Sequence, residues 1–359
     1  MKLKQFQSIL KKHKLKFALF QRFDPFLFYF TRQSEGLLIV PATKKPFVVS
    51  NKLEFERVKK YAKGFSVKKW TKNEEELIKW INDIVGNESK KGNYSYAVND
   101  KVIPLANANW YKKQLKGKQK ALPKEVYDLR ATKTKEEIKI IKRNVNMTCS
   151  IFNKLFNELK LDKHRKEKNK KFVYEIDIRD FLDNEARANG YSLSYPTIVA
   201  SGKNSSMPHY HPEGKVKLKG FTVIDFGVFK DGYCSDITRT VYFGKPSKKE
   251  IDDYYKLLNC QQKYIKMLKL KLPFKNLKEI ARKDLGKHFI HSLGHGFGIE
   301  THEEPFFRGE NKIEKFQTFT IEPGIYYERK YGIRIEDDIF VNNKIEVLSG
   351  KLRKDLMRF

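Results

Sequence analysis

Two acidic residues in an otherwise apolar hairpin are the first sign of chemistry in this sequence. The segment Val223–Thr240 is typical of two short strands joined by a turn at residues 230–232. Asp225 stands in the apolar strand and Asp236 on the returning strand. A charged carboxylate in a half-buried strand costs several kcal/mol unless a cation or hydrogen-bond donors neutralise it. The pair therefore indicates either a metal site or two structural aspartates held by donors, and the hairpin alone does not separate these.

The later part of the chain adds three residues of the kinds that bind metals. They are His295 in HSLGHGFG, Glu322 in TIEPG and Glu336 in IRIEDD. Four carboxylates with one imidazole favour harder divalent ions such as Mn²⁺, although Co²⁺, Fe²⁺ or Zn²⁺ can occupy such sites. Four negative charges about balance two divalent ions, and a two-metal site can activate water against a carbonyl. This composition predicts a dinuclear hydrolase.

Strand alternation supports this set of residues. In the expected strand 333–341, Arg334, Glu336 and Asp338 share one face, while Ile333 and Ile335 face the core.

Several histidines lie near these candidate ligands in turn-rich segments. His209 and His211 stand in MPHYHPEG, and His302 stands in ETHEEP. Taken singly, each is best explained as an ordinary surface histidine. Beside five candidate ligands, His209 and His302 become candidates for the site. His291 precedes His295 by four residues, which places both on one side of a helix or strand.

Two capping boxes help to define the elements that must position these residues. Thr134–Glu137 and Ser247–Glu250 each combine a hydroxyl with a glutamate three residues later, which is typical of a helix start. A pair of helices followed by strands is expected twice, which predicts two related halves with a site between them. Expected helices cover 134–159, 178–188, 247–268 and 277–287, and strand-like segments cover 192–240, 291–300, 318–322 and 333–341.

The first part of the chain predicts a small α/β domain without chemistry of its own. It contains no glycine-rich phosphate loop and no cluster of acids or histidines. A basic segment, 112–124, with Pro123 near its end, sets the expected boundary, giving domains 1–125 and 126–359. Expected helices cover 3–13, 53–62 and 74–84, and expected strands cover 17–20, 36–40, 46–50 and 94–98.

Composition narrows the class of protein. The chain has 359 residues, 40% of them apolar and 13% aromatic, and a formal net charge of +31. Because the lysines are spread over every segment, this charge does not favour nucleic acid as a partner. Three cysteines without a paired spacing fit a reducing compartment. With neither a signal peptide nor an apolar span at the N-terminus, we expect a cytoplasmic protein and no membrane partner.

Six segments in order resemble the metallopeptidase family that holds Xaa-Pro aminopeptidase, prolidase and methionine aminopeptidase. They are YPTIVASGKNSSMPH, VIDFG, SDITRT, HSLGHGFGIETHEEP, TIEPGIY and GIRIED, covering about residues 130–345. The resemblance implies the pita-bread fold, in which two αβ halves are related by pseudo-symmetry. This agrees with the element order above.

The resemblance also implies a role for each candidate ligand. Asp225 is similar to the acid that binds one metal with both oxygens, and Asp236 and Glu336 are similar to the bridging carboxylates. His295 and Glu322 are similar to ligands of the second metal. Glu322 would also carry the proton of the water that attacks the substrate.

The remaining candidates match substrate-contacting positions of the family. His302 is similar to the histidine that holds the scissile carbonyl, and His209 to the one that stabilises the tetrahedral intermediate or the leaving nitrogen. His291 and Arg334 match positions near the substrate's proline in proline-specific members. For Arg334, pairing with a neighbouring acid is an equal alternative.

The N-terminal domain favours the proline-specific branch, because methionine aminopeptidases usually lack one. An Xaa-Pro aminopeptidase acting on peptides with proline at the second position is the first expectation, and a prolidase restricted to Xaa-Pro dipeptides is the alternative. A non-catalytic binding module of the same fold is a distant alternative, disfavoured because all five ligands are present. The resemblance further implies a homodimer and two divalent ions, with Mn²⁺ expected.

Overall fold

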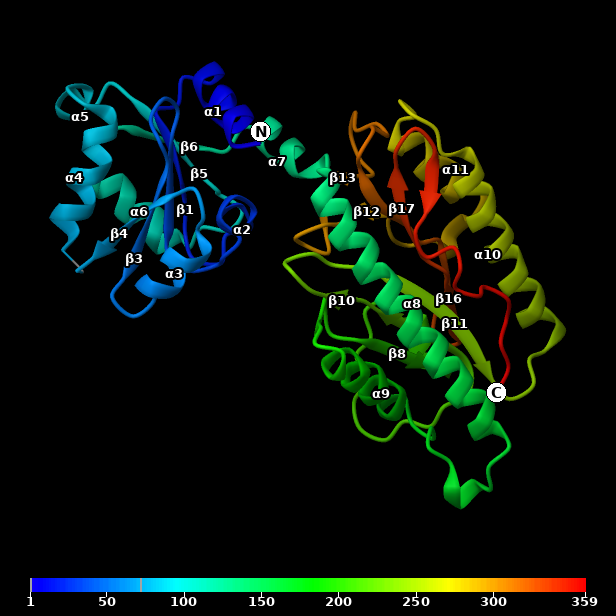
Figure 1. Ribbon diagram of the computed structural model, residues 1–359. Coiled ribbons are helices and arrows are strands. Elements are labelled where there is room, and N and C mark those ends of the chain that lie inside the picture. Colours follow the sequence, from blue (N-terminus) through cyan, green and yellow to red (C-terminus); the bar gives the residue numbers. More distant parts are fainter. Residues whose placement is uncertain (1, 72) are drawn as a thin grey trace. The chain divides into compact units, whose positions relative to one another are not determined.

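The computed structural model describes residues 2–71 and 73–359 and divides the chain into two compact units, 1–129 and 130–359. The boundary expected between residues 125 and 126 falls inside helix α7 (Lys124–Ala131). Both units mix helices with sheets, so the predicted α/β class is confirmed (Figure 1). Among the described residues, no helix has the length and apolar character needed to cross a bilayer.

The N-terminal unit is built on a six-stranded sheet of order β4-β3-β2-β1-β5-β6, in which only β2 runs against its neighbours. Every predicted helix and strand is present within about two residues: α1 (Lys2–Lys12), β1 (Phe17–Phe20), β2 (Leu37–Pro41), β3 (Phe47–Asn51), α3 (Phe55–Tyr61), α4 (Glu74–Val85) and β5 (Ser95–Val98). Five further elements are present that were not predicted: α2 (Pro25–Thr31), β4 (Ser66–Trp70), α5 (Glu88–Lys91), α6 (Leu105–Gln114) and β6 (Lys118–Ala121).

Alternation along β1 explains why helices cover both faces of this sheet (Figure 1). Phe17 and Leu19 point to the face that is packed by α4 and α6. Phe20 points to the opposite face, where its ring contacts Phe6 of α1 and Phe26 of α2. A fully apolar strand is therefore buried on both sides, as is usual for a central strand.

The second unit consists of two halves with the same order of elements, which confirms the predicted two-half architecture. The first half has α8 (Lys135–Lys163), α9 (Glu175–Ala188) and the sheet formed by β8 (Ile198–Ser201), β9 (Gly220–Phe226) and β11 (Ile237–Phe243). The second half has α10 (Lys248–Met267), α11 (Phe274–Leu285) and the sheet formed by β12 (His295–Gly296), β13 (Glu303–Phe306), β14 (Thr318–Ile321), β17 (Asp337–Val341) and β18 (Ile345–Val347). Each half centres on one apolar cluster between its helices and its sheet, and a few residues of the other half complete it: Phe297 enters the cluster of the first half, and Phe221 and Tyr242 enter that of the second.

Short elements complete the second unit. They are β7 (Ser192–Leu193), β10 (Val228–Phe229), β15 (Gly324–Tyr327), β16 (Tyr331–Arg334) and the 3₁₀ turns η1 (Glu167–Asn169), η2 (Gly202–Ser206) and η3 (Gly286–His288).

Both predicted capping boxes are present and fix the starts of α8 and α10. The Glu137 N–H donates to Thr134 Oγ1 over 3.2 Å, and the Thr134 N–H donates to Glu137 Oε2 over 2.7 Å. Ser247 and Glu250 form the same reciprocal pair at α10. Each box satisfies two backbone donors that a helix start leaves without partners.

The hairpin that carries Asp225 and Asp236 is formed by β9 and β11 in antiparallel register, with Asp225 opposite Thr238. Its tip uses Asp231 and Gly232 at φ values of 51° and 80°. Two consecutive positive φ angles match the tight turns that follow the twist of a hairpin. Asp236 lies directly before β11, within reach of Asp225 across the pair.

The single strand expected over 333–341 is wrong in one respect. The chain breaks at Ile335 and Glu336 into β16, which pairs with β15, and β17, which pairs with β14 and β18. Ile333 and Ile335 still enter the apolar cluster of the second half. At the break, the Glu336 N–H donates to the Thr238 carbonyl of β11 over 3.1 Å, which places Glu336 beside the hairpin of the first half.

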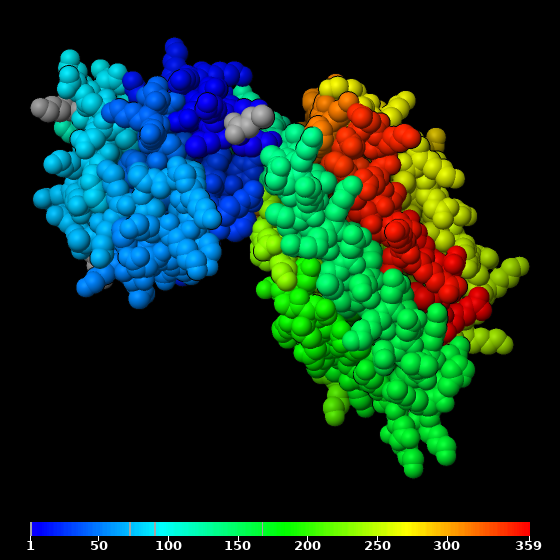
Figure 2. Space-filling view, viewed as in Figure 1, coloured from blue at the N-terminus to red at the C-terminus, as the bar shows by residue number. Residues whose placement is uncertain are grey.

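The C-terminal segment packs onto the second unit between α8 and the α10–α11 pair, as the red surface in Figure 2 shows. The fully buried Arg239 of β11 holds the C-terminal segment in place by hydrogen bonds. Its Nη2 donates to Asp337 Oδ1 over 2.9 Å, and its Nε donates to the Arg353 carbonyl over 3.0 Å. Burying this guanidinium is tolerable because carbonyls and a carboxylate accept its donors.

A buried ion cluster ties the start of the second unit to β13. Lys133 Nζ donates to Glu303 Oε1 over 2.8 Å, and the Arg130 guanidinium donates to Glu303 Oε2. Burial acts to raise the pKa of Glu303, but Arg130 and Lys133 outweigh it, and the net pKa is lowered. The cluster therefore depends on an ionised Glu303.

Replacing this carboxylate should cost stability and change its dependence on pH. Glu303→Gln removes the charge opposite two buried cations, and we expect a loss of about 3–5 kcal/mol in the free energy of unfolding. Because the folded pKa lies below the ordinary value of 4.5, the stabilisation is complete above that pH and disappears as the pH falls through the folded pKa. Thermal unfolding measured from pH 7 to pH 3 should show a shallower acid decline for the variant.

Glu310→Gln is the matched control, because the exposed Glu310 pairs with Lys275 only at the surface. It should leave unfolding unchanged. Equal unfolding curves for Glu303→Gln and wild type would contradict the role given to the buried cluster.

Candidate metal centre and substrate cavity

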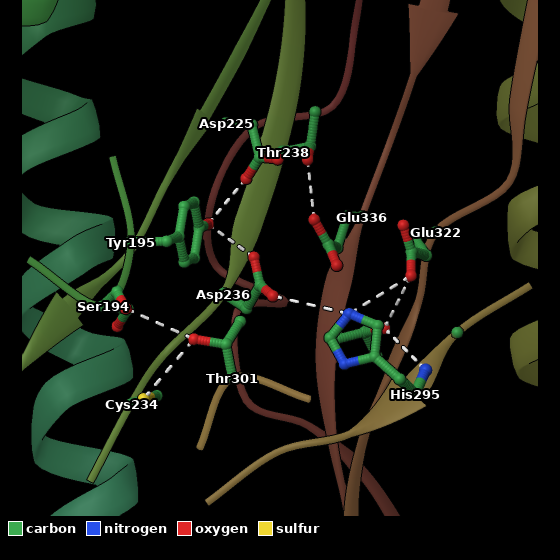
Figure 3. A network of polar contacts seen from close by, with 12 residues as sticks. Ser194, Tyr195, Asp225, Cys234, Asp236, Thr238, His295, Thr301, Glu322 and Glu336 are labelled. Carbon is green, nitrogen blue, oxygen red and sulfur yellow. Dashed lines mark hydrogen bonds and ion pairs between the residues drawn. The ribbon is translucent and has the colours of Figure 1, made fainter. Parts of the chain in front are cut away.

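The five candidate ligands come from both halves of the second unit. Asp225 lies in β9 and Asp236 just before β11, whereas His295 opens β12, Glu322 follows β14 and Glu336 precedes β17. Each stands at or next to the end of a strand, where the backbone can turn its side chain toward the other half. Figure 3 shows these side chains converging on one small region from the two sheets.

Distances confirm that the acids and the imidazole are neighbours. His295 Nε2 lies 3.3 Å from Glu322 Oε1 and 3.6 Å from Asp236 Oδ2. One ligand atom from each of Asp236, His295 and Glu336 falls within 4.8 Å of the other two, and all three residues are buried. This spacing lets three donor atoms reach a common ion.

The carboxylates of the cluster repel one another, so the site requires added positive charge. Burial raises the pKa of Asp236 well above its ordinary value, and the carboxylates of Asp225 and Asp338 raise it further. Burial and the charge of Asp236 do the same to Glu336. Burial also raises the pKa of Glu322, to about 8. These acids cannot all be ionised together unless a cation compensates them, so the residues fit a site for divalent ions.

His295 is prepared to act as a neutral ligand. Its Nδ1 faces the Gly296 carbonyl at 3.3 Å, and because a carbonyl only accepts, Nδ1 carries the proton. Burial and the neighbouring His302 lower the pKa of His295 to about 3. Its Nε2 therefore presents a lone pair to the acids, which is the arrangement a metal-binding histidine requires.

Tyr195 was not foreseen as part of the site. Its hydroxyl oxygen lies within hydrogen-bond distance of both acids, 2.6 Å from Asp225 Oδ1 and in short contact with Asp236 Oδ1 (Figure 3). The contact bridges the two acids of the hairpin and fixes their separation. Tyr195 belongs to the segment YPTIVASG, but a single tyrosine before a proline gives no physical signal of such a contact.

Arg334 pairs with Asp225, which is one of the two roles expected for it, the other being contact with the substrate's proline. Its Nη2 donates to Asp225 Oδ2 over 2.7 Å, and its Nε donates to Thr238 Oγ1 over 3.1 Å. Thr238 in turn donates to Glu336 Oε2 over 2.6 Å. The guanidinium thus orients two of the five candidate ligands. Its expected contact with substrate stays a prediction.

All nine predicted site residues line one cavity of about 530 Å³. Two basic residues that were not predicted also line this cavity, Lys278 of α11 and Arg308. The Arg308 guanidinium lies over the Phe306 ring. The cavity therefore has an acidic region at the candidate metal centre and separate cationic groups on its wall.

The other predicted histidines lie beside the acids. The His302 and His295 rings are 4.0 Å apart between centroids, and burial lowers the pKa of His302. His291 donates from Nδ1 to the Ser292 carbonyl over 2.7 Å, and its Nε2 lies 3.1 Å from the Tyr326 hydroxyl. Burial and then Arg334 lower the pKa of His291 to about 4. These imidazoles are neutral near pH 7.

Comparison with known proteins places the chain in a family. Residues 139–343 match the model of metallopeptidase family M24, and residues 2–132 match the creatinase/prolidase N-terminal domain. The chain belongs to metallopeptidase family M24. It is therefore a hydrolase that depends on divalent metal ions, and the resemblance inferred from its motifs is confirmed.

Three relatives illustrate the range of similarity. The chain is 30% identical over 345 residues to the Xaa-Pro dipeptidase of Pyrococcus furiosus, covering 92% of each chain. The structure of an Xaa-Pro dipeptidase from Bacillus anthracis has a TM-score of 0.87 at 27% identity and covers 100% of this chain and 99% of that one. The X-Pro aminopeptidase of Thermotoga maritima has a TM-score of 0.81 at 27% identity and covers 96% and 98%. These comparisons favour the dipeptidase alternative over the aminopeptidase expected first.

Asp236→Asn should separate metal binding from folding. Without metal, the variant should be as stable as wild type or more so, because it removes a buried carboxylate that burial and its neighbours disfavour. Adding Mn²⁺ at 100 times its Kd should raise the free energy of unfolding of wild type by about 2.7 kcal/mol. The variant should gain far less, since a candidate ligand is lost. Thermal unfolding with Mn²⁺ and with a chelator measures both effects.

Asp231→Asn, at the exposed tip of the same hairpin, should respond to Mn²⁺ as wild type does. A full Mn²⁺ response in Asp236→Asn would refute the assignment of Asp236 as a ligand.

Proposed function

We propose that this chain is an Xaa-Pro dipeptidase, which hydrolyses the bond between the first residue of a dipeptide and a C-terminal proline. The observation that carries the proposal is the pair of cationic side chains, Lys278 and Arg308, in the same cavity as the acidic cluster. A dipeptide has a free carboxylate on its proline, next to the bond that is cut. Longer peptides place an uncharged amide there, which gives these cations no partner.

Five residues would hold two divalent ions. They are the four acids Asp225, Asp236, Glu322 and Glu336 and the neutral imidazole of His295. When bound, such ions polarise a carbonyl and lower the pKa of water. Mn²⁺ is the ion that the oxygen-rich donor set favours.

Glu322 is the residue that we assign to proton transfer. Its Oε1 faces His295 Nε2, whereas its Oε2 lies 3.9 Å from His291 Nδ1. Glu322 Oε2 would take the proton of the attacking water and pass it to the leaving nitrogen. Proline has no N–H within a peptide bond, so the nitrogen must gain this proton to leave as a stable amine.

His302 and His209 would stabilise the charge that develops on the substrate. Partial burial lowers the pKa of His302, which favours the neutral ring, and a neutral ring can donate one hydrogen bond to the scissile carbonyl oxygen. His209 would donate to the tetrahedral intermediate or support the leaving nitrogen. Donors that are already in place for this charge are typically worth a factor of 10²–10³ each in kcat.

Substrate length is the direct test of the proposal. With Mn²⁺ present, the purified protein should cleave a Met-Pro dipeptide with kcat/KM at least about tenfold above that for Met-Pro-Gly, and a chelator should abolish both reactions. Release of the first residue measured by chromatography gives the two rates. Faster cleavage of the tripeptide would support an Xaa-Pro aminopeptidase instead, and no cleavage of either peptide would overturn both assignments.

Removing a cation should affect dipeptides specifically. Arg308→Ala should raise KM for Met-Pro about tenfold or more, because a charge-assisted contact with the carboxylate is lost. The KM for Met-Pro-amide, which lacks that charge, should change little. Steady-state kinetics on both peptides measure the difference.

Lys275→Ala is the control for Arg308→Ala, since Lys275 pairs with Glu310 at the surface of α11 and does not line the cavity. It should leave both KM values unchanged. A proportional rise for both peptides in Arg308→Ala would argue against recognition of the carboxylate.

A further inference from the structure

His209 lacks a hydrogen bond of its own to hold its ring. It lies in the loop between η2 and β9, and within the part of the chain that the structure describes, no residue hydrogen-bonds to its imidazole. The ring nevertheless faces the cavity. His302 lines the same cavity. The position of this ring is therefore set by its backbone.

The residues on either side of His209 are both anchored. Arg334 Nη1 donates to the Pro208 carbonyl over 3.1 Å, from the second half of the unit. The Tyr210 hydroxyl donates to Glu175 Oε2 over 2.8 Å, in the first half. The backbone of His209 is thus fixed from two sides. Arg334, which lines the cavity, holds Pro208, and Glu175, which does not line the cavity, holds Tyr210.

The side chain of Glu175 accepts hydrogen bonds from three residues of the segment 201–210, which contains His209. Its side chain is fully buried in the first turn of α9. Oε1 accepts from the Ser201 N–H over 2.6 Å and from Asn204 Nδ2 over 3.0 Å, while Oε2 accepts from Tyr210. One carboxylate therefore joins three points of the segment 201–210. A carboxylate that only satisfied its own helix start would bond to α9 itself.

Tyr210 connects the loop to the strand that carries a candidate ligand. Its ring packs on Ile198, Ala200 and Val223, and Val223 precedes Asp225 by two residues in β9. Tyr210 does not line the cavity, so it does not contact substrate there. The position of His209 relative to Asp225 is accordingly set by Tyr210, through its packing on the sheet and its bond to Glu175.

We propose that Tyr210 and Glu175 are positioning residues that hold His209 in place for catalysis. The inference rests on the proposed function, since it presumes that His209 acts on the substrate. Burial raises the pKa of Tyr210 to about 12, which keeps the hydroxyl protonated as a donor across the working range of pH. We call the hydrogen-bonded pair Tyr210 and Glu175 the clamp. Its loss should lower kcat and leave KM nearly unchanged, because the clamp positions His209, a group that is needed in the transition state.

Tyr210→Phe tests the clamp with the smallest change. It deletes one hydroxyl and keeps the ring that packs on the sheet. We expect kcat for Met-Pro to fall about tenfold while KM changes less than threefold, since a displacement of 1 Å at a catalytic group can cost a factor of about 10². The melting temperature should match that of Tyr242→Phe, which deletes a similar tyrosine–glutamate bond of 2.9 Å to Glu250 outside the cavity.

A double variant shows whether the effect passes through His209. His209→Ala should lower kcat by about 10², and adding Tyr210→Phe should then lower it no further. An equal tenfold loss from Tyr210→Phe with and without His209 would overturn the clamp, as would a Tyr210→Phe enzyme with the kcat of wild type. Wild-type kcat in His209→Ala would instead refute the role of His209 in the proposed function.

Glu175 provides a second measurement. Glu175→Gln keeps an oxygen that can accept from the Ser201 N–H, whereas Glu175→Ala leaves the loop without either acceptor. We expect kcat to fall further in Glu175→Ala than in Glu175→Gln, with partial rescue by glutamine. Equal losses in the two variants at equal melting temperatures would contradict the clamp.

Discussion

The repulsion among buried carboxylates is the constraint on which the second unit depends. Asp225, Asp236, Glu322 and Glu336 lie around one cavity, and all but Glu322, which is half-buried, are buried. Folding them together is unfavourable unless cations and donors are supplied at the same place. Arg334 and the Tyr195 hydroxyl supply part of this compensation, and divalent ions would supply the remainder. The same requirement that makes the cluster costly makes it selective for multiply charged cations.

This constraint also explains why the two halves must meet as they do. The first half supplies two of the acids and the second half supplies the imidazole and the other two. Hydrogen bonds between the halves end on the candidate ligands: Arg334 of the second half donates to Asp225, and Thr238 of the first half donates to Glu336. The apolar clusters also link the halves, because Phe221 and Tyr242 of the first half enter the cluster of the second. The polar contacts add direction to this packing, since they require particular groups to face each other.

Much of the architecture could be predicted because residues close together in the sequence determine where the helices start and which of their faces are buried. The capping boxes at Thr134 and Ser247 and the period of the long helices mark the repeated half, and the acids placed in apolar strands mark the site. Other elements escaped for identifiable reasons. The aromatic run of α2 gives no helical period, although Asp24 caps it by accepting from the Phe26 N–H over 2.8 Å, and Pro25 opens it.

The partners of the site residues could not be predicted in the same way. Tyr195 and Asp236 are 41 residues apart, and Arg334 and Asp225 are 109 apart. No local pattern links residues at such separations. The contact of Tyr195 follows from packing within the first half, and that of Arg334 from the packing of the two halves. Lys278 and Arg308 likewise stood among many other basic residues, and only the cavity distinguishes them.

The surplus of lysine has one structural consequence in the N-terminal unit. β4 and β6 are the outermost strands of its sheet, and each carries two lysines, at positions 68, 69, 118 and 120. Because of these lysines, neither segment shows the apolar pattern of a strand, so neither strand was predicted. An outermost strand offers backbone groups that can pair with another molecule, and lysines along it oppose such pairing by repulsion. Part of the positive charge thus protects the sheet against edge-to-edge aggregation, independently of any partner.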